Sequence, residues 1–107
     1  MYLYNTTFAV DTSLEEDVIR WIKNEFIPSA VEDEYFLSDS GRAPAALRVV
    51  GGEPGVSSIA VHLYCESIVD IKDWYADRGA RLFNDVIERW DGKVVFFSTT
   101  LEILYGC

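Results

Sequence analysis

Two side chains capable of acid–base and nucleophilic chemistry lie three positions apart in residues 59–67, which have the sequence IAVHLYCES. His62 is the one histidine of the chain, and Cys65 is one of its two cysteines. An imidazole beside a thiol can remove its proton and produce a thiolate nucleophile. The residues alternate as in a β-strand, however, and successive side chains of a strand point to opposite faces. The pattern therefore predicts that Cys65 faces the core and His62 faces away, which disfavours a catalytic pair within this strand.

The elements around this strand are predicted from changes in periodicity and from turn residues. Asp11, Thr12 and Ser13 can each cap a helix, Pro28 predicts a kink or a restart of the first helix, and Gly79 predicts a joint in the second helix. The segment GGEPG at residues 51–55 predicts a turn between two strands. The predicted elements are a strand at residues 2–10, a helix at 14–26, strands at 43–50 and 58–66, a helix at 68–90 and a strand at 93–104.

The order β-α-β-β-α-β in 107 residues predicts an α+β fold of the ferredoxin-like type. In that plan a four-stranded antiparallel sheet carries both helices on one face. We expect residues 1–107 to form a single ferredoxin-like domain. The second face of such a sheet is open, and it should be polar unless a partner covers it.

Strand alternation predicts which side chains reach this open face. The face that the helices cover should carry Cys65 as a small core hydrophobe. The three tryptophans of the helices should lie in the same core. The predicted open face mixes hydroxyl, amide, imidazole, charged and aromatic groups, which is typical of a ligand pocket. The predicted ligand-binding residues are Asn5, Thr7, Arg48, His62, Tyr64, Phe96, Ser98, Thr100 and Glu102.

Several of these residues have a structural interpretation as well as a functional one. His62 is either a surface or interface histidine or a catalytic base, and it is the one catalytic candidate. Arg48 and Glu102 either bind a ligand or form an ion pair across the sheet. Tyr64 and Phe96 either line a pocket or fill a subunit interface.

The charge of the chain limits the classes of partner. Eighteen acidic and nine basic residues give a net charge of −9, which opposes binding to nucleic acid and to an anionic membrane surface. We therefore expect no nucleic acid partner and no membrane partner. No apolar run approaches the ~20 residues of a membrane span and residues 1–13 do not resemble a signal peptide, so we expect a cytoplasmic location. The single histidine and the spacing of the cysteines predict no metal and no cofactor, and both Cys65 and Cys107 are expected to be free thiols.

Several motifs of the chain resemble those of a family of short bacterial proteins described as a domain of unknown function. They are Tyr2-x-Tyr4-Asn5-x-Thr7, residues 21–36 with Ile27-Pro28, Glu66-Ser67, Trp90-x-Gly92-Lys93 and residues 99–102. That family is similar to the dimeric α/β-barrel superfamily, in which two ferredoxin-like sheets pack through their open faces. The resemblance implies a homodimer, and other branches of the superfamily include cofactor-free monooxygenases, dehydratases, isomerases and haem-degrading enzymes.

The chain departs from the family pattern at two positions. Phe26 stands where relatives often carry histidine, and Ser98 stands where many carry arginine. Roles that need those side chains are not transferred to this chain, and no catalytic role is transferred to His62.

Three hypotheses for function follow. The first is a homodimer that binds a small organic molecule in a cavity at the open sheet face. The second is a cofactor-free oxygenase or isomerase that uses His62 as its base. The third is a structural or adaptor protein that acts through an acidic helix surface formed by residues 15–17 and 32–34.

Overall fold

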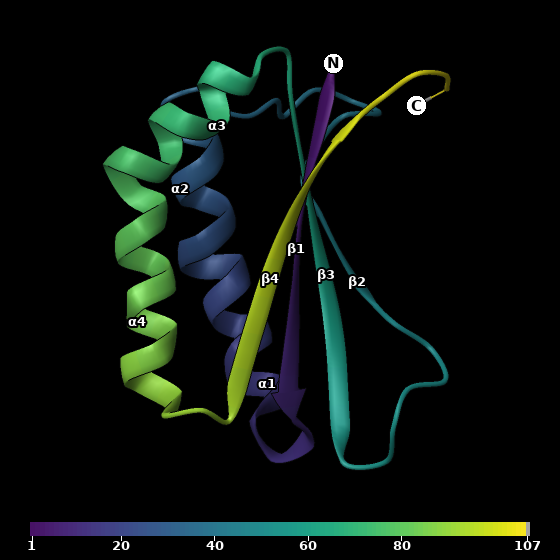
Figure 1. The fold of residues 1–107 in the computed structure, drawn as a ribbon, viewed down its shortest axis with the longest axis vertical. Helices are drawn as coiled ribbons and strands as arrows, with labels where there is room; N and C mark the ends of the chain where they lie inside the picture. The colour runs from purple at the N-terminus through teal and green to yellow at the C-terminus, as the bar shows by residue number, and fades with distance from the viewer. Residues whose placement is uncertain (107) are drawn as a thin grey trace.

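The computed structural model describes residues 1–106 and contains one sheet with all its helical segments on one side (Figure 1). The strands are β1 (Tyr2–Asp11), β2 (Ala45–Arg48), β3 (Val56–Cys65) and β4 (Val94–Glu102). The helical segments are η1 (Thr12–Leu14), α1 (Glu15–Trp21), η2 (Ile22–Phe26), α2 (Ile27–Val31), α3 (Ile68–Trp74), η3 (Tyr75–Gly79) and α4 (Ala80–Trp90). The predicted order of strands and helical stretches is confirmed.

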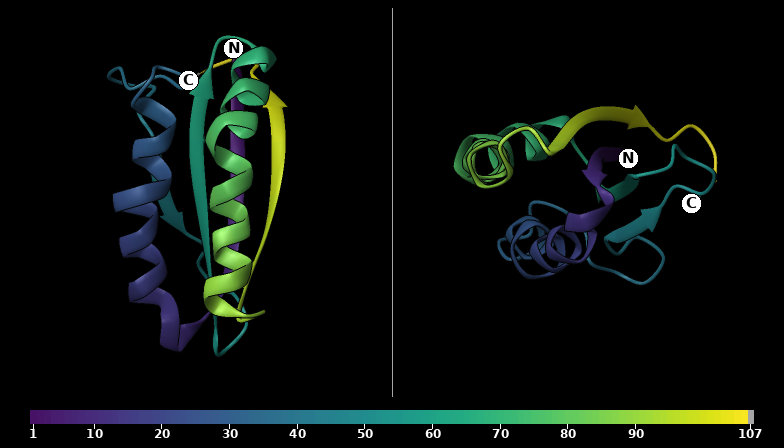
Figure 2. Two further views of the ribbon diagram at one scale, coloured as in Figure 1. Left: turned by 90° about the vertical axis from the view of Figure 1, so that its left-hand side faces the viewer. Right: turned by 90° about the horizontal axis from the view of Figure 1, so that it is seen from below.

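The sheet has the strand order β2-β3-β1-β4, and every neighbouring pair is antiparallel. The two helical stretches, α1–α2 and α3–α4, lie side by side over the same face of the sheet (Figure 2). The opposite face carries no helix (Figures 1 and 2). The α+β, ferredoxin-like arrangement predicted from the sequence is therefore present in the described residues.

Local signals explain where the helices begin. The Asp11 carboxylate accepts a hydrogen bond of 3.0 Å from the backbone N–H of Ser13, at the start of η1. Ser67 caps α3 in the same way, with 3.2 Å between its hydroxyl oxygen and the N–H of Val69. Both are short polar side chains, which satisfy N–H groups that the first helical turn leaves free.

The predicted irregularity at Pro28 coincides with a change of helix type, because α1 passes into the segment η2 and α2 begins at Ile27, while the helical stretch as a whole continues from Glu15 to Val31. The intervening segment η2 is a π-helical turn, in which the N–H of Ile27 bonds to the carbonyl of Ile22. Proline lacks an N–H and its ring collides with the carbonyl four residues earlier. The wider π turn directly before Pro28 gives the chain a way to pass the proline without breaking the helix.

The predicted joint at Gly79 is also a π-helical turn, η3, and not a break. A Cβ atom at this position would lie 2.7 Å from Cζ3 of the Trp74 ring. Trp74 is fully buried, so the ring has no space to withdraw. The glycine is required here by close packing.

The core lies between the helices and the sheet and is rich in aromatic rings. Phe8 and Phe26 meet edge to face at 5.5 Å, and Phe26 and Trp74 do so at 5.7 Å. The tryptophans are buried, as predicted, and Cys65 is buried as a free thiol. Burial is the main cause that raises the pKa of the Cys65 thiol to about 11, with a further contribution from the charge of Asp70. Cys107, for which a free thiol was also predicted, lies outside the described residues.

Candidate functional site

The open face of the sheet is ordered in rows by the pairing of its strands. Directly paired residues share a face, and Asn5 on β1 lies opposite His62 on β3 and opposite Thr99 on β4. These three residues form a polar row across the middle of the sheet. Predicted positions of Asn5, Thr7, His62 and Tyr64 on the open face are confirmed by the register.

The polar row is bordered by apolar side chains on both sides. The row on one side consists of Tyr64, Leu3 and Leu101, and the row on the other of Ala60, Thr7 and Phe97. A further row consists of Ser58, Ala9 and Val95, and Ala45 and Leu47 of β2 extend two of the rows. Phe97, Val95, Leu101 and Leu47 are exposed hydrophobic residues of this face.

For β4, the sequence predicted the wrong set of alternating residues on the open face. Phe96 faces the helices, because its ring stacks on that of Phe83 at 4.7 Å and contacts Phe8. Ser98 also faces the helices, where its hydroxyl shares a hydrogen bond of 2.8 Å with the buried hydroxyl of Thr6. Thr100 and Glu102 pair with Tyr4 and Tyr2 and have the same orientation. Val95, Phe97, Thr99 and Leu101 lie on the open face instead, which is the reverse of the alternation that placed Phe96, Ser98, Thr100 and Glu102 there.

The predicted position of Arg48 on the open face is also wrong. Arg48 pairs with Ile59, which faces the core, and its guanidinium hydrogen-bonds to the carboxylate of Glu15. The Glu15 carboxylate also accepts a bond of 2.6 Å from the hydroxyl of Ser57. The Ser57 bond, followed by the Arg48 bond, lowers the pKa of Glu15. An ion pair between Arg48 and Glu102 is ruled out, because β2 and β4 are opposite edges of the sheet.

Among the described residues of the open face, Asn5 has a buried polar atom that lacks a hydrogen-bond partner. Its amide nitrogen donates to the hydroxyl of Thr7 at 3.3 Å, whereas its amide oxygen is buried and has no partner in the described residues. A buried oxygen without a donor is destabilising and calls for an explanation. A donor from a ligand, or a small rotation of the side chain toward the neighbouring His62, would satisfy it.

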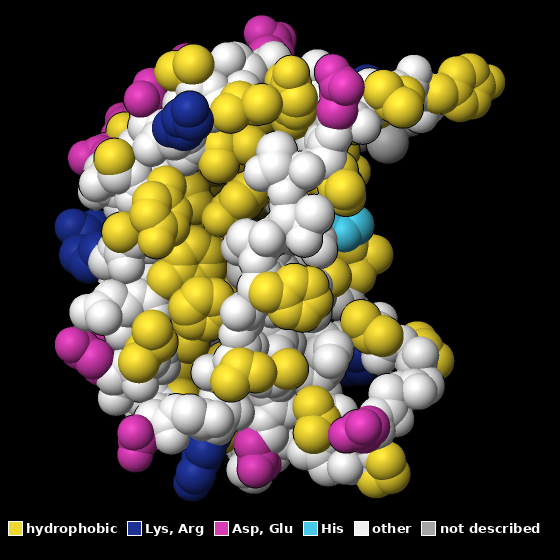
Figure 3. Space-filling model, in the orientation of Figure 1, with side chains coloured by type: hydrophobic (Ala, Val, Ile, Leu, Met, Phe, Trp, Pro, Cys, Tyr) yellow, Lys and Arg dark blue, Asp and Glu magenta, His cyan; other side chains and the backbone are white. Residues whose placement is uncertain are grey.

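The open face is concave, and His62 lies in the hollow. In Figure 3 the histidine, in cyan, lies at the edge of the molecule between two projections, one at the top and one at the bottom. The lower projection is the loop between β2 and β3, and the upper one is the C-terminal tail, as Figure 1 shows. The imidazole of His62, the amide of Asn5 and the hydroxyls of Thr7, Tyr64 and Thr99 can orient a small molecule by hydrogen bonds.

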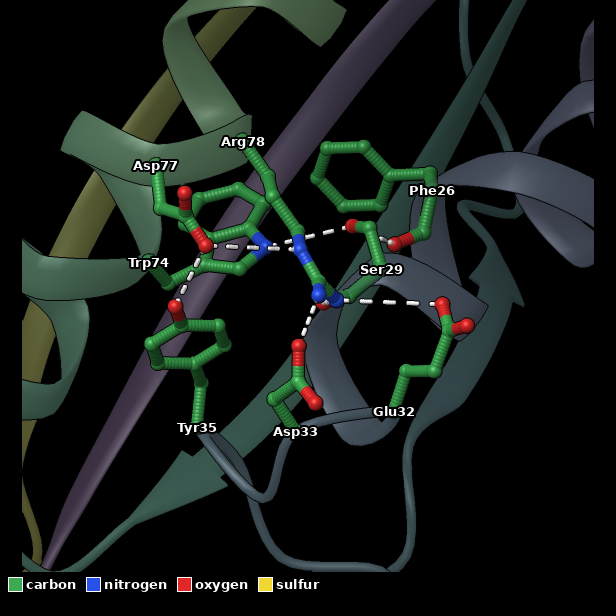
Figure 4. Close-up of polar contacts among 8 residues, drawn as sticks. All are labelled: Phe26, Ser29, Glu32, Asp33, Tyr35, Trp74, Asp77 and Arg78. Atoms are coloured by element: carbon green, nitrogen blue, oxygen red, sulfur yellow. Dashed lines mark hydrogen bonds and ion pairs between the residues drawn. The ribbon is translucent and has the colours of Figure 1, made fainter.

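A second polar cluster, which no pattern in the sequence predicted, joins the two helical stretches (Figure 4). The Arg78 guanidinium donates to the backbone carbonyl of Ser29 at 2.9 Å and to the carboxylate of Asp33. It lies over the ring of Tyr35, whose hydroxyl donates to Asp77 at 2.5 Å. This bond to Asp77 is the main cause that raises the pKa of the Tyr35 hydroxyl. The cluster fastens α2 to η3, and its groups are engaged with one another.

These contacts bear on the acidic helix surface predicted for an adaptor. Asp33 pairs with Arg78, Glu15 pairs with Arg48, and Asp17 pairs with Arg20 at 3.2 Å. Part of the acidic charge is therefore neutralised within the chain. No observation in the described residues favours a basic partner on this surface.

Two further features limit the chemistry. Residues 1–106 contain no group of three or more His, Cys, Asp or Glu side chains placed to hold a metal ion. In the same part of the chain, no helix is both long and apolar enough to cross a membrane.

Comparison with known proteins identifies a family and a fold. The model of a family described as Domain of unknown function (DUF4286) matches residues 1–104. No curated protein matches the sequence of the chain. Among solved structures, the chain is similar to a dimeric ferredoxin-like protein from an uncultured marine organism, with a TM-score of 0.65 and 12% sequence identity. The similarity covers 99% of this chain and 98% of that protein, and at this identity it shows the fold alone.

Proposed function

The chain belongs to the family Domain of unknown function (DUF4286), and from the geometry of its open face we propose that it is a homodimer that binds a small organic molecule. In this proposal residues 1–107 act as one domain, and the two open faces pack together as a dimeric α/β barrel. The cavity between them contains the polar row of Asn5, His62 and Thr99. The observation that supports the proposal most strongly is that exposed apolar side chains surround this row on a sheet face without helices.

A second copy of the chain is the partner that fits this face. The rows from Tyr64 to Ser58 and from Leu101 to Val95 contain no Asp, Glu, Lys or Arg among the described residues. The chain as a whole carries a net charge of −9, so two copies repel each other wherever charged surfaces meet. An uncharged face with Phe97 and Leu101 exposed permits two copies to associate and buries apolar surface. The similar marine protein is described as dimeric, which agrees with this arrangement.

The polar row favours a ligand in the cavity over a dry interface. Asn5 has a buried amide oxygen without a donor, and Thr99 and Tyr64 bring hydroxyl groups to the same face. A ligand with a hydrogen-bond donor and an apolar body would satisfy the amide and fill the space over Phe97. Asn5, Thr7, His62 and Tyr64 remain the proposed ligand-binding residues. Ser98, Phe96, Thr100, Glu102 and Arg48 point to the other side of the sheet and are not part of this cavity.

Native mass spectrometry of the protein purified from its own host tests this function. We expect a dimer that carries the additional mass of a small organic molecule. Asn5→Ala and His62→Ala should lower the fraction of loaded dimer and leave the dimer itself intact. Asn84→Ala is the matched control, because Asn84 lies on α4 and bonds only to Glu88 on the same helix. A dimer that carries no ligand and that no compound stabilises against heating would contradict the proposal.

A further inference from the structure

The C-terminal tail beyond β4 carries two large side chains that contact almost nothing. Leu104 is 87% exposed and Tyr105 is 98% exposed. The backbone N–H of Ile103 still bonds to the carbonyl of Met1 at 3.0 Å, so the tail leaves the sheet directly after this bond. Adjacent apolar residues with this degree of exposure are typical of an interaction site.

The tail projects on the side of the sheet that carries no helix. Figure 1 shows it leaving the upper end of β4 away from the helices, and the view from below in Figure 2 shows the same direction. At the lower end the β2–β3 loop projects toward the same side, with Val50 92% exposed. The tail and the loop thus border the hollow that contains the histidine, and each carries exposed apolar side chains, although the loop also carries the acidic Glu53 (Figure 3).

We propose that the tail is an exchanged arm, in which Leu104 and Tyr105 of each protomer pack on the open face of the other and close one end of its cavity. This inference rests on the homodimer proposed above. When two open faces meet, a tail that extends in front of its own sheet enters the space of the second copy. The symmetry of such a dimer is isologous, so the arm of each protomer makes the same contact.

The chemistry of the arm matches the surface that it meets. Leu104 and Tyr105 are uncharged, and the open face presents Leu47, Val95 and Phe97 as exposed apolar groups. Tyrosine is enriched at protein interfaces, since its ring buries a large area and its hydroxyl can still bond to a polar group or to water. The polar row around His62 offers such groups. Each ligand cavity is therefore completed by a residue from the second copy.

Photo-crosslinking tests the arm directly. A variant Tyr105→p-benzoylphenylalanine is mixed with ¹⁵N-labelled wild-type chain, the subunits are allowed to exchange, and cross-linked peptides are mapped by mass spectrometry. We expect cross-links from position 105 of the light chain to peptides of the sheet strands β1, β2, β3 or β4 of the heavy chain. The same photoreactive residue at Ile87, which is exposed on α4, is the control and should give no cross-link to these strands. Cross-links from position 105 that stay within one chain or reach only helices would overturn the proposal.

A second measurement separates failure of the arm from failure of the dimer. The variant Leu104→Ser/Tyr105→Ser should raise the dimer dissociation constant by about tenfold or more, as loss of interface anchor residues does. Because both side chains are exposed, the fold of the subunit should not change, which circular dichroism checks. A dimer of unchanged affinity would refute the arm and leave the function proposed above standing. A wild-type chain that is monomeric would overturn both.

Discussion

Asn5 and His62 lie directly opposite each other on neighbouring antiparallel strands, on the face of the sheet that no helix covers. The amide oxygen of Asn5 is buried there without a donor, and exposed apolar side chains border the pair. The pair supports both parts of the proposed function. The apolar border favours association with a second copy of the chain, and the unsatisfied amide favours binding of a ligand.

Replacing Arg78 tests the polar cluster that holds the helical stretches together. The side chain of Arg78 is 20% exposed and its guanidinium bonds to a backbone carbonyl and to the carboxylate of Asp33. Hydrogen bonds from a charged donor stabilise a fold, but the Asp33 carboxylate is largely exposed and solvent weakens its bond. We therefore expect Arg78→Ala to lower the free energy of unfolding by about 1–2 kcal/mol. Urea denaturation measures this loss.

The matched control is Arg20→Ala. Arg20 pairs with Asp17 within one helix, and both side chains are largely exposed. An exposed pair of this kind contributes about 0.5 kcal/mol or less. Equal losses for the two variants would show that the Arg78 cluster has no special role in joining the helices.

Gly79→Ala tests the close packing against Trp74. The added Cβ would lie 2.7–3.0 Å from three atoms of a fully buried indole ring. Overpacking of this kind outweighs the helix propensity that alanine gains, so we expect a net loss of about 1–2 kcal/mol in the free energy of unfolding. Gly52→Ala is the control, because Gly52 has no atom within 4 Å of the added Cβ and no positive φ angle. If Gly79→Ala were as stable as the wild type, the Trp74 ring would have room that the structure does not show.

Cys65 should be a poor nucleophile while the protein is folded. With its pKa raised to about 11 by burial, only about one thiol in a thousand is ionised at pH 8. In a Cys107→Ser background, iodoacetamide should label native Cys65 at least about a hundredfold more slowly than Cys65 of the chain unfolded in urea. Rapid labelling of the native protein would indicate an accessible thiolate.

The raised pKa of Cys65 also predicts that the protein loses stability at high pH. The folded state favours the neutral thiol, since its pKa is raised from the ordinary value of 9.0. The contribution to stability is therefore complete below pH 9 and is lost as the pH rises toward 11. Comparison of wild type with Cys65→Ala by urea denaturation at pH 8 and pH 11 should show the difference between them shrinking.

The sequence predicted the orientation of β1 and β3 because each has one apolar face and one mixed face. In β3 this alternation places Cys65 in the core and His62 outside, as the structure shows. In β4 the residues VVFF are apolar on both faces, so alternation alone did not distinguish them. The polar residue Thr99 on the predicted inner face was the one signal for the opposite orientation. Ser98 is polar as well, but its hydroxyl is paired with Thr6 inside, a contact between residues far apart in the sequence.

Contacts between distant residues also explain the misplacement of Arg48. The strand β2 has only four residues, too few for a clear alternation, and Arg48 is directed by its bond to Glu15 on another element. The π-helical turns are similar cases, because Pro28 and Gly79 signalled an irregularity without specifying its type. The sequence therefore predicted the order of elements and the open-face positions of Asn5, Thr7, His62 and Tyr64, and missed Thr99 and the apolar side chains that β4 contributes.

Dimerisation through the open face underlies the whole proposed function, and sedimentation equilibrium of Phe97→Asp beside Val69→Asp tests it. Both side chains are similarly exposed in the subunit, at 61% and 58%, but Phe97 lies on the open face and Val69 lies on α3. A carboxylate at position 97 would be buried without a partner in the dimer, which is strongly unfavourable. We expect the wild type and Val69→Asp to have twice the chain mass of 12.1 kDa, and Phe97→Asp to have the mass of one chain. A dimeric Phe97→Asp variant, or a monomeric wild type at tens of micromolar, would contradict it.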